Sequence, residues 1–395
     1  MKKILAMLLA LCMVLALCAC GAKTEAPAEK PAETPAEAPA ETVETPEEAP
    51  EAPTYKVAMI TDYGDITDQS FNQTTYEACK AFCEANAVEF SYYKPAGDST
   101  AERVAMVDAA VADGFNVIVM PGYAFGETIT QTADLYPEVY FIALDVSAGD
   151  LGDYTLPENV FCAVYQEELC GYMAGYAAVK LGYTELGFLG GMAVPAVIRF
   201  GNGYLQGVDA AAKELGIVDQ VSVEYVYGNQ FYGDPDITAV MDTWYGEKGV
   251  ECVFACGGGI WTSAAEAAAK VGGKVIGVDV DQAATIDGLY GEGMTITSAM
   301  KGLAPTVNDV LTAILAGNWS DYAGKIETLG LVSADPEANY VQIPMATTQF
   351  AEGFTAEDYK ALVSAMFDGT ITVSNDIANF PVTEVAVEQH ANIKG

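Results

Sequence analysis

Histidine and arginine are nearly absent from this sequence of 395 residues. The single histidine is His390, and the two arginines are Arg103 and Arg199. A Ser-His-Asp or Cys-His active site and a histidine-based zinc site both need histidine, so the composition argues against all three. We expect His390 to lie at the surface of a mobile C-terminal tail.

Positive charge of any kind is scarce. The chain has 18 Lys and Arg against 55 Asp and Glu, which gives a formal net charge of −37. Nucleic-acid binding depends on basic patches that neutralise phosphates, so the sequence predicts no nucleic-acid partner.

Three common ligand motifs are also missing. The acidic stretch "TDYGDITDQSFNQ" (residues 61–73) has Gly64 where an EF-hand loop needs its second ligand, and Asn72 where it needs a bidentate Glu. The stretch "GFLGGMAVP" lacks the Gly-x-Gly-x-x-Gly spacing of a dinucleotide site, and the chain has no P-loop lysine motif. We therefore expect no metal, no cofactor and no catalytic centre.

The N-terminal residues have the pattern of a secretory signal. Two lysines precede an apolar run that is short for a membrane span and ends in "LCAC". This ending resembles a bacterial lipobox, which implies cleavage after residue 19 and lipidation of the Cys20 thiol. The six cysteines that follow Cys20 are expected to be buried, unpaired small apolar residues.

Residues 20–54 are rich in Ala, Glu and Pro and have almost no large apolar side chains. Such a segment cannot bury a core, so we expect a solvated tether that would span about 100 Å as polyproline II. The remaining residues, roughly 340, suit two domains of ordinary size.

Strand-like and helix-like segments alternate from residue 55 onward. Ten apolar strand patterns occur, from "YKVAMIT" to "TITSAM", and amphipathic segments such as residues 70–86, 166–181 and 203–215 lie between them. This alternation predicts an α/β fold with doubly wound parallel sheets covered by helices on both faces.

Short polar or glycine-rich turns follow six of the predicted strands. The turns hold Asp62, Gly122, Asp145, Gly190-Gly191, Gly257 to Gly259 and Asp279. Because ligands bind at the carboxyl ends of parallel strands, these turns predict a small-molecule site at that edge of the sheets.

Several stretches resemble the basic membrane protein family of purine-nucleoside-receptor-like lipoproteins that serve ABC transporters. They include "VAMITDYGDITDQSFNQTTYEACKAF", "LGFLGGMAVPAVIRFGNGYLQGVDAAA", "VIGVDVDQ" and "TSAMKGL", within residues 55–320. The resemblance implies a type I periplasmic-binding-protein fold, in which two lobes joined by a three-segment hinge close over a nucleoside. It implies an N-terminal lobe of residues 55–162 and 284–325 and a C-terminal lobe of residues 163–283 and 326–395.

The resemblance also implies an aromatic clamp. Phe71 matches the ring that stacks on the base, and Phe231 matches its partner from the other lobe. The segment "FYGDP" has one residue more than the usual spacing, so Tyr232 is the alternative to Phe231.

Polar roles follow from the same matches. Asp145 corresponds to the carboxylate that accepts hydrogen bonds from the base, and Asp279 and Lys301 correspond to the pair that holds the ribose hydroxyls. Further polar contacts are expected from Asp62, Ser70, Asn72 and the backbone of Gly257. Asp62 could instead cap the helix that begins near residue 70.

The sequence thus predicts a monomeric, lipid-anchored nucleoside-binding protein on the outer face of the cell membrane, with a permease and an ATPase as partners. Three alternatives stay open: the same fold with a sugar, a flavin or a signal molecule as its ligand, a sensor lipoprotein, and an extracellular nucleosidase.

Overall fold

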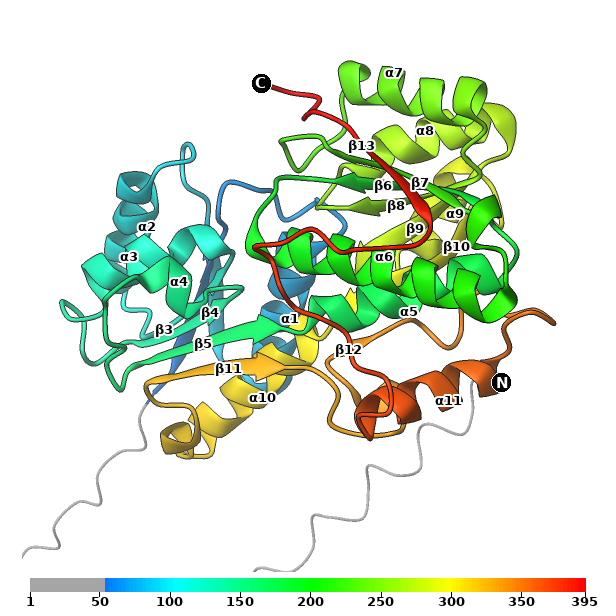
Figure 1. Cartoon of the computed structure of the whole chain (residues 1–395). Helices are drawn as coiled ribbons and strands as arrows, with labels where there is room; N and C mark the ends of the chain where they lie inside the picture. The colour runs from blue at the N-terminus through cyan, green and yellow to red at the C-terminus, as the bar shows by residue number, and fades with distance from the viewer. Residues whose placement is uncertain (1–53) are drawn as a thin grey trace, which may run out of the picture. The chain divides into compact units, whose positions relative to one another are not determined.

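Two mostly parallel β-sheets, each covered by helices, make up the described part of the chain (Figure 1). The computed structural model describes residues 54–395. The predicted signal peptide, the Cys20 lipidation site and all but the last residue of the tether lie outside the described residues. Among residues 54–395, no helix combines the length and apolar composition that a membrane crossing needs.

The first sheet has six strands in the order β11-β5-β4-β3-β1-β2, all parallel. The strands are β1 (Lys56–Ile60), β2 (Glu89–Tyr93), β3 (Val117–Pro121), β4 (Tyr140–Leu144), β5 (Val160–Tyr165) and β11 (Lys325–Leu329). The helices of this first lobe are α1 (Phe71–Asn86), α2 (Thr100–Ala112), α3 (Gly126–Thr132), α4 (Ala148–Leu151) and α10 (Leu303–Leu315). Every residue of β3 is buried, as expected for a central strand with both faces covered.

The second sheet has seven strands in the order β12-β10-β9-β8-β6-β7-β13. The strands are β6 (Glu185–Gly190), β7 (Ser222–Tyr227), β8 (Cys252–Cys256), β9 (Lys274–Asp279), β10 (Thr295–Lys301), β12 (Val341–Gln342) and β13 (Ala386–Gln389). The helices of this second lobe are α5 (Glu167–Lys180), α6 (Pro195–Leu215), α7 (Pro235–Thr243), α8 (Trp261–Val271), α9 (Ala283–Tyr290) and α11 (Ala356–Phe367). Only β12 runs antiparallel to its neighbour.

All ten predicted strands are present, but the expected lobe boundaries are wrong in detail. The expected first boundary, between residues 162 and 163, falls inside β5, and the chain leaves the first sheet after Tyr165. The expected switch at residue 284 is too early, because β10 pairs with β9 in the second sheet and the chain crosses back after Lys301. The third crossing follows Leu329, because β11 pairs with β5.

The three crossings are neighbours in space. Gln166 N–H donates to the Leu329 carbonyl at 2.9 Å, Gly302 N–H donates to the Tyr340 carbonyl at 2.6 Å, and Tyr340 N–H donates to the Gly330 carbonyl at 3.0 Å. Side chains on Gly302 or Gly330 would collide with Tyr340 or with the Gln166 side chain. The crossings therefore form one compact hinge between the lobes.

The second lobe contains an unusually close helix pair, α5 and α6. A methyl group on Gly171 would lie 2.3 Å from the Phe200 carbonyl oxygen, and one on Gly203 would lie 2.1 Å from the Glu168 carbonyl oxygen. Only glycine permits this approach of two backbones. The contact fixes the first turn of α5 beside the first turns of α6, where Glu167 and Arg199 lie.

The six cysteines of the described residues are free and buried, as predicted. His390 corrects the expectation of a mobile tail. Its backbone N–H donates to the Tyr225 carbonyl at 2.8 Å, its ring contacts Trp244, and its side chain bonds Glu224.

Candidate functional site

A cavity of about 350 Å³ lies where the carboxyl ends of the strands of both sheets meet. The turns after β1, β3, β4, β8 and β9 contribute residues to its lining, as the pattern of turns predicted, whereas Gly190 and Gly191 at the end of β6 are not among the lining residues. This size is in the range of sites that enclose small molecules. Of the nine expected ligand-binding residues, Ser70 alone is not part of the lining, which includes Asp62, Phe71, Asn72, Asp145, Phe231, Gly257, Asp279 and Lys301.

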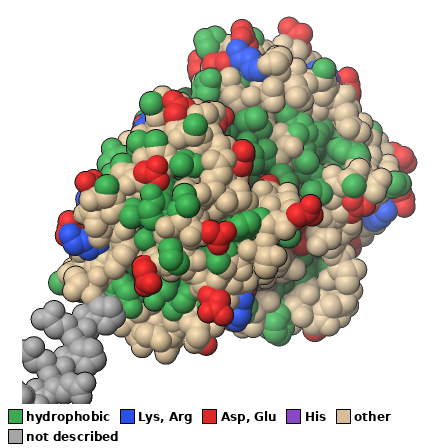
Figure 2. All heavy atoms as spheres, turned by 90° about the vertical axis from the view of Figure 1, so that its left-hand side faces the viewer, with side chains coloured by type: hydrophobic (Ala, Val, Ile, Leu, Met, Phe, Trp, Pro, Cys, Tyr) green, Lys and Arg blue, Asp and Glu red, His purple; other side chains and the backbone are tan. Residues whose placement is uncertain are grey.

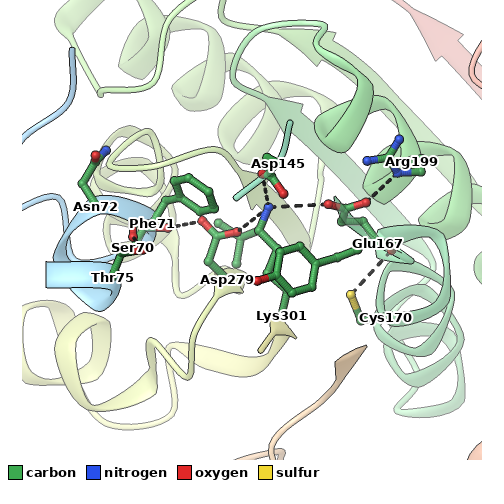
Figure 3. Close-up of polar contacts among 12 residues, drawn as sticks. Ser70, Phe71, Asn72, Thr75, Asp145, Glu167, Cys170, Arg199, Asp279 and Lys301 are labelled. Carbon is green, nitrogen blue, oxygen red and sulfur yellow. Dashed lines mark hydrogen bonds and ion pairs between the residues drawn. The ribbon is translucent and has the colours of Figure 1, made fainter. Parts of the chain in front are cut away.

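Lys301 lies at the centre of a buried cluster of charges (Figure 3). Its Nζ is 2.6 Å from Asp145 Oδ2, 3.5 Å from Glu167 Oε1 and 3.7 Å from Asp279 Oδ1. Arg199 Nε bonds the other oxygen of Glu167 at 2.5 Å. With these five groups ionised, three carboxylates face two cations.

The expected roles of these residues therefore need one revision. Asp279 and Lys301 are neighbours, but the closer partner of Lys301 is Asp145. Asp145, which is expected to contact the base, and Asp279, which is expected to contact the ribose, thus share the ammonium group of Lys301. Asp145 Oδ1 is buried and has no hydrogen-bond partner in the protein, so it is free to accept from a ligand.

Asp145 and Asp279 are related by position as well as by charge. Each ends or directly follows a central strand, and each has a left-handed backbone, with φ of 63° and 65°. Aspartate tolerates this region better than most residues, but it is uncommon outside glycine. The strained turns direct both carboxylates toward Lys301 from the two lobes.

Burial and the neighbouring charges together set the pKa values in the cluster. Burial raises the pKa of Asp279 to about 6, although Lys301 and Ser70 stabilise its charged form. Burial alone would lower the pKa of Lys301, but the three carboxylates raise it above its ordinary value, so this residue stays charged. Burial also raises the pKa of Glu167 above its ordinary value, against the opposing effect of Arg199.

Ser70 contacts the opposite lobe. Its hydroxyl donates to Asp279 Oδ2 at 2.5 Å, and beside it Gln282 Nε2 donates to the Gln69 carbonyl at 2.9 Å. Residues 69 and 70 precede α1 in the first lobe, and residues 279 and 282 belong to the second lobe. These two bonds join the lobes in a closed arrangement.

Asp62 shapes its own turn and does not cap the helix. Its Oδ1 accepts from the backbone N–H groups of Tyr63 and Gly64 and from the Asn72 amide. Asp68 takes the capping role, with its carboxylate accepting from the N–H groups of Ser70, Asn72 and Gln73. The buried Asn72 Oδ1 is left without a protein partner.

The two expected aromatic residues come from opposite lobes and are both half-buried in the lining. Lys301 Nζ lies 4.6 Å from the centre of the Phe71 ring, a cation–π contact. Phe231 packs on glycines, because a side chain on Gly191 or Gly257 would collide with its ring. Tyr232 also reaches the lining, but it is 63% exposed.

Sequence reasoning missed Glu167 and Arg199. Arg199 lines the cavity, and Glu167 is fully buried behind Lys301. One signal was available, because Arg199 is one of two arginines in the chain and lies in the quoted stretch "GGMAVPAVIRFGNGYLQGV". Its partner is 32 residues away, so spacing alone did not pair them.

The surface outside the cavity carries mainly negative charge. On the face shown in Figure 2, acidic side chains are scattered among apolar ones, and basic side chains are fewer. This distribution agrees with the formal charge of −37.

Comparisons with known proteins agree with this architecture. The profile of the family described as "ABC transporter substrate-binding protein PnrA-like" matches residues 55–365. The chain is 26% identical over 240 residues to "ABC transporter nucleoside-binding protein BmpA" of Lactococcus lactis, a match that covers 58% of this chain and 64% of that protein, slightly less than two thirds. It is 27% identical over 294 residues to "Basic membrane protein B" of Borreliella burgdorferi, covering 72% of this chain and 81% of that protein.

A solved structure shows the same fold. The ABC transporter solute-binding protein of Conexibacter woesei superposes with a TM-score of 0.63 at 22% identity, covering 82% of this chain and 99% of that chain. The architecture is that of a type I periplasmic binding protein, as the sequence predicted. From the match over residues 55–365, the chain belongs to the family of PnrA-like ABC transporter substrate-binding proteins.

Proposed function

We propose that this protein binds nucleosides, with purine nucleosides preferred, and delivers them to the permease and ATPase of an ABC transporter. Members of the family are solute-binding proteins, which carry a ligand and do not transform it. The observation that carries the proposal is the composition of the interlobe cavity. It combines two half-buried aromatic rings from opposite lobes with a buried lysine between two carboxylates.

The chemistry of the lining suits the two halves of a nucleoside. Flat rings offer stacking, which contributes about 1–3 kcal/mol per base. Carboxylates only accept hydrogen bonds and ammonium groups only donate them, so together they satisfy ribose hydroxyls, which do both. The unpartnered Oδ1 atoms of Asp145 and Asn72 favour a ligand that brings N–H or O–H donors.

The mechanism we propose is closure around the ligand. Asp279 and Phe231 lie on one lobe, and Phe71 and Asp145 lie on the other. A ligand that contacts both sets has all of its contacts only in the closed form, so it shifts the equilibrium toward closure. The hinge at residues 166, 302 and 330 is the place where the backbone would rotate.

The same proposal includes the N-terminal residues. Cleavage after residue 19 and lipidation of Cys20 would anchor the protein to the outer face of the cell membrane. Residues 20–54 would then be the tether that carries the binding domain to the permease.

A thermal-shift panel on residues 54–395 tests the ligand. The protein is unfolded and refolded to remove any bound molecule, then heated with adenosine, guanosine, inosine, cytidine, uridine, free bases, riboflavin or pentoses. A ligand at a hundred times its Kd adds about 2.7 kcal/mol of stability. We expect nucleosides to raise Tm and free bases and pentoses to have little effect. A shift with pentoses or riboflavin alone would overturn the nucleoside assignment.

A further inference from the structure

The last 28 residues of the chain lie beyond the family match and wrap around the second lobe. The match ends at residue 365, and residues 368–395, which we name the C-terminal strap, follow α11. The strap runs along α6, where three side chains bond its backbone (Figure 1, red). Asn202 donates to the Asp376 carbonyl, Gln206 bonds Ser374 twice, and Asp209 accepts from residues 384 and 385.

The strap then joins the sheet and is fixed by charge. Strand β13 pairs in parallel with β7 at the edge of the second sheet. Lys248 Nζ lies 2.7 Å from Glu224 and 3.2 Å from Glu388, and His390 bonds the same Glu224. The only histidine of the chain therefore helps to hold the strap.

The strap ends at the loop that carries Phe231. Ile393 N–H donates to the Tyr227 carbonyl at 2.9 Å, at the end of β7. One residue later, Lys394 Nζ lies 2.7 Å from Asp234 Oδ2 and also pairs with Asp236. We call residues 228–234, between β7 and α7, the Phe231 loop.

The carboxylate of Asp234 accepts the hydrogen bonds that connect this loop to α7. Its Oδ1 caps α7 by accepting from the N–H groups of Asp236 and Ile237. Its Oδ2 accepts from Gln230 Nε2 at 3.0 Å, and the same Nε2 donates to the Tyr232 carbonyl at 2.8 Å. The Gln230 side chain, which precedes Phe231, is thus bonded to Tyr232 and Asp234, which follow it.

Lys394 neutralises the carboxylate on which this arrangement depends. Asp234 and Asp236 are like charges two residues apart, and Lys394 pairs with both. Burial would raise the pKa of Asp234, but Lys394 and the N–H of Ile237 hold it below its ordinary value. Lys394 therefore offsets the repulsion between the two carboxylates and contacts the same Asp234 Oδ2 that accepts from Gln230.

We propose that Lys394 is a positioning residue, through which the C-terminal strap holds the Phe231 loop in the orientation that contacts the ligand. The expected effect of Lys394 on affinity rests on the proposed function, whereas its expected effect on the Phe231 loop is independent of the ligand. The strap thus adds to the binding site a support that the family match does not include.

The first arm of the test compares Lys394→Gln, Lys394→Arg and the control Lys270→Gln by calorimetric titration with guanosine and adenosine. Lys270 forms a similar ion pair with Asp242 between α8 and α7, in the same lobe. We expect Lys394→Gln to weaken binding about three- to fivefold, the scale of a partly exposed ion pair, with Tm nearly unchanged. Lys394→Arg should restore affinity, and Lys270→Gln should leave it at the wild-type value.

The second arm measures amide hydrogen exchange in the ligand-free proteins. We expect faster exchange at residues 228–233 in Lys394→Gln and unchanged exchange in the Lys270→Gln control. Equal exchange at residues 228–233 in Lys394→Gln and in wild type would overturn the positioning role. An equal loss of affinity in Lys394→Gln and in the Lys270→Gln control would overturn it as well. If the wild-type protein binds no nucleoside but exchange at the loop rises as expected, the proposed ligand fails and the positioning role stands.

Discussion

Replacement of Asp279 by asparagine should make the ligand-free protein more stable and a poorer binder. The change keeps the shape of the side chain and an oxygen that accepts from the Ser70 hydroxyl. It removes a charge that is 95% buried and that only partly benefits from Lys301 at 3.7 Å. Lys301 keeps its closer partner, Asp145, at 2.6 Å.

The magnitude follows from the pKa of Asp279. Its ordinary value is 3.8, and burial raises it to about 6 in the folded protein. The difference corresponds to about 3 kcal/mol by which the ionised form disfavours folding. Because the folded protein binds this proton between about pH 6 and pH 4 and the unfolded chain does not, wild-type stability rises as the pH falls through this window. We therefore expect Asp279→Asn to be more stable by up to about 3 kcal/mol at pH 7, by about half of that at pH 5, and by little below pH 4.

Two measurements check this reasoning. Urea unfolding at pH 7, 5 and 4 gives the stability difference, and at pH 7 the rise in Tm should be at most about 4 °C. Calorimetric titration should show nucleoside affinity about ten- to a hundredfold lower, because hydrogen bonds to a charged group contribute about 1.5–3 kcal/mol. A variant that is less stable than wild type at pH 7 would refute the account of a buried and unfavourable charge. A stability difference of the same size at every pH would refute it as well.

Three further predictions concern the cluster, the lobe contact and the clamp. Lys301→Met leaves the buried carboxylates without their shared cation and should cost about 3–5 kcal/mol at pH 8 in urea unfolding, with a smaller loss at pH 5, where Asp279 takes up a proton. An undiminished loss at pH 5 would contradict this. Ser70→Ala should shift the ligand-free protein toward an open form with a larger radius of gyration in X-ray scattering, whereas Ser147→Ala, whose hydroxyl bonds within its own lobe, should not. Phe231→Ala should lower nucleoside affinity by about 1–3 kcal/mol and Tyr232→Ala by much less, and the reverse order would assign the stacking to Tyr232.

Local pattern was sufficient to predict the strands and the edge at which the cavity lies. A run such as "NVIVM" is apolar throughout because β3 is covered on both faces, and the turn residues that follow such strands gather at one edge by topology. Asp145, Asp279 and Gly257, which end or follow these strands, line the cavity. The family likeness added Phe71 and Phe231, which pattern alone does not single out.

Pairings between distant segments were not accessible in this way. Strand–helix alternation does not tell which of two sheets a strand joins, so the boundary expected at residue 284 puts β10 in the wrong lobe. Ser70 reaches Asp279 across 209 positions, and Glu167 pairs with Lys301 across 134, so neither contact leaves a local signal. Strand β11 has mostly polar or exposed residues, and the end of the strap looked like a free tail because its bonds depend on α6 and β7.

The central claim is that one nucleoside binds between the lobes, with its base stacked between one aromatic ring from each lobe. Calorimetric titration of refolded residues 54–395 with purine nucleosides, in wild type and in the Phe71→Ala/Phe231→Ala double variant, tests it most directly. The account predicts one site per chain, a negative heat-capacity change from buried apolar surface, and a large loss of affinity in the double variant. Absence of binding in the wild type, or equal affinity in the double variant, would contradict it.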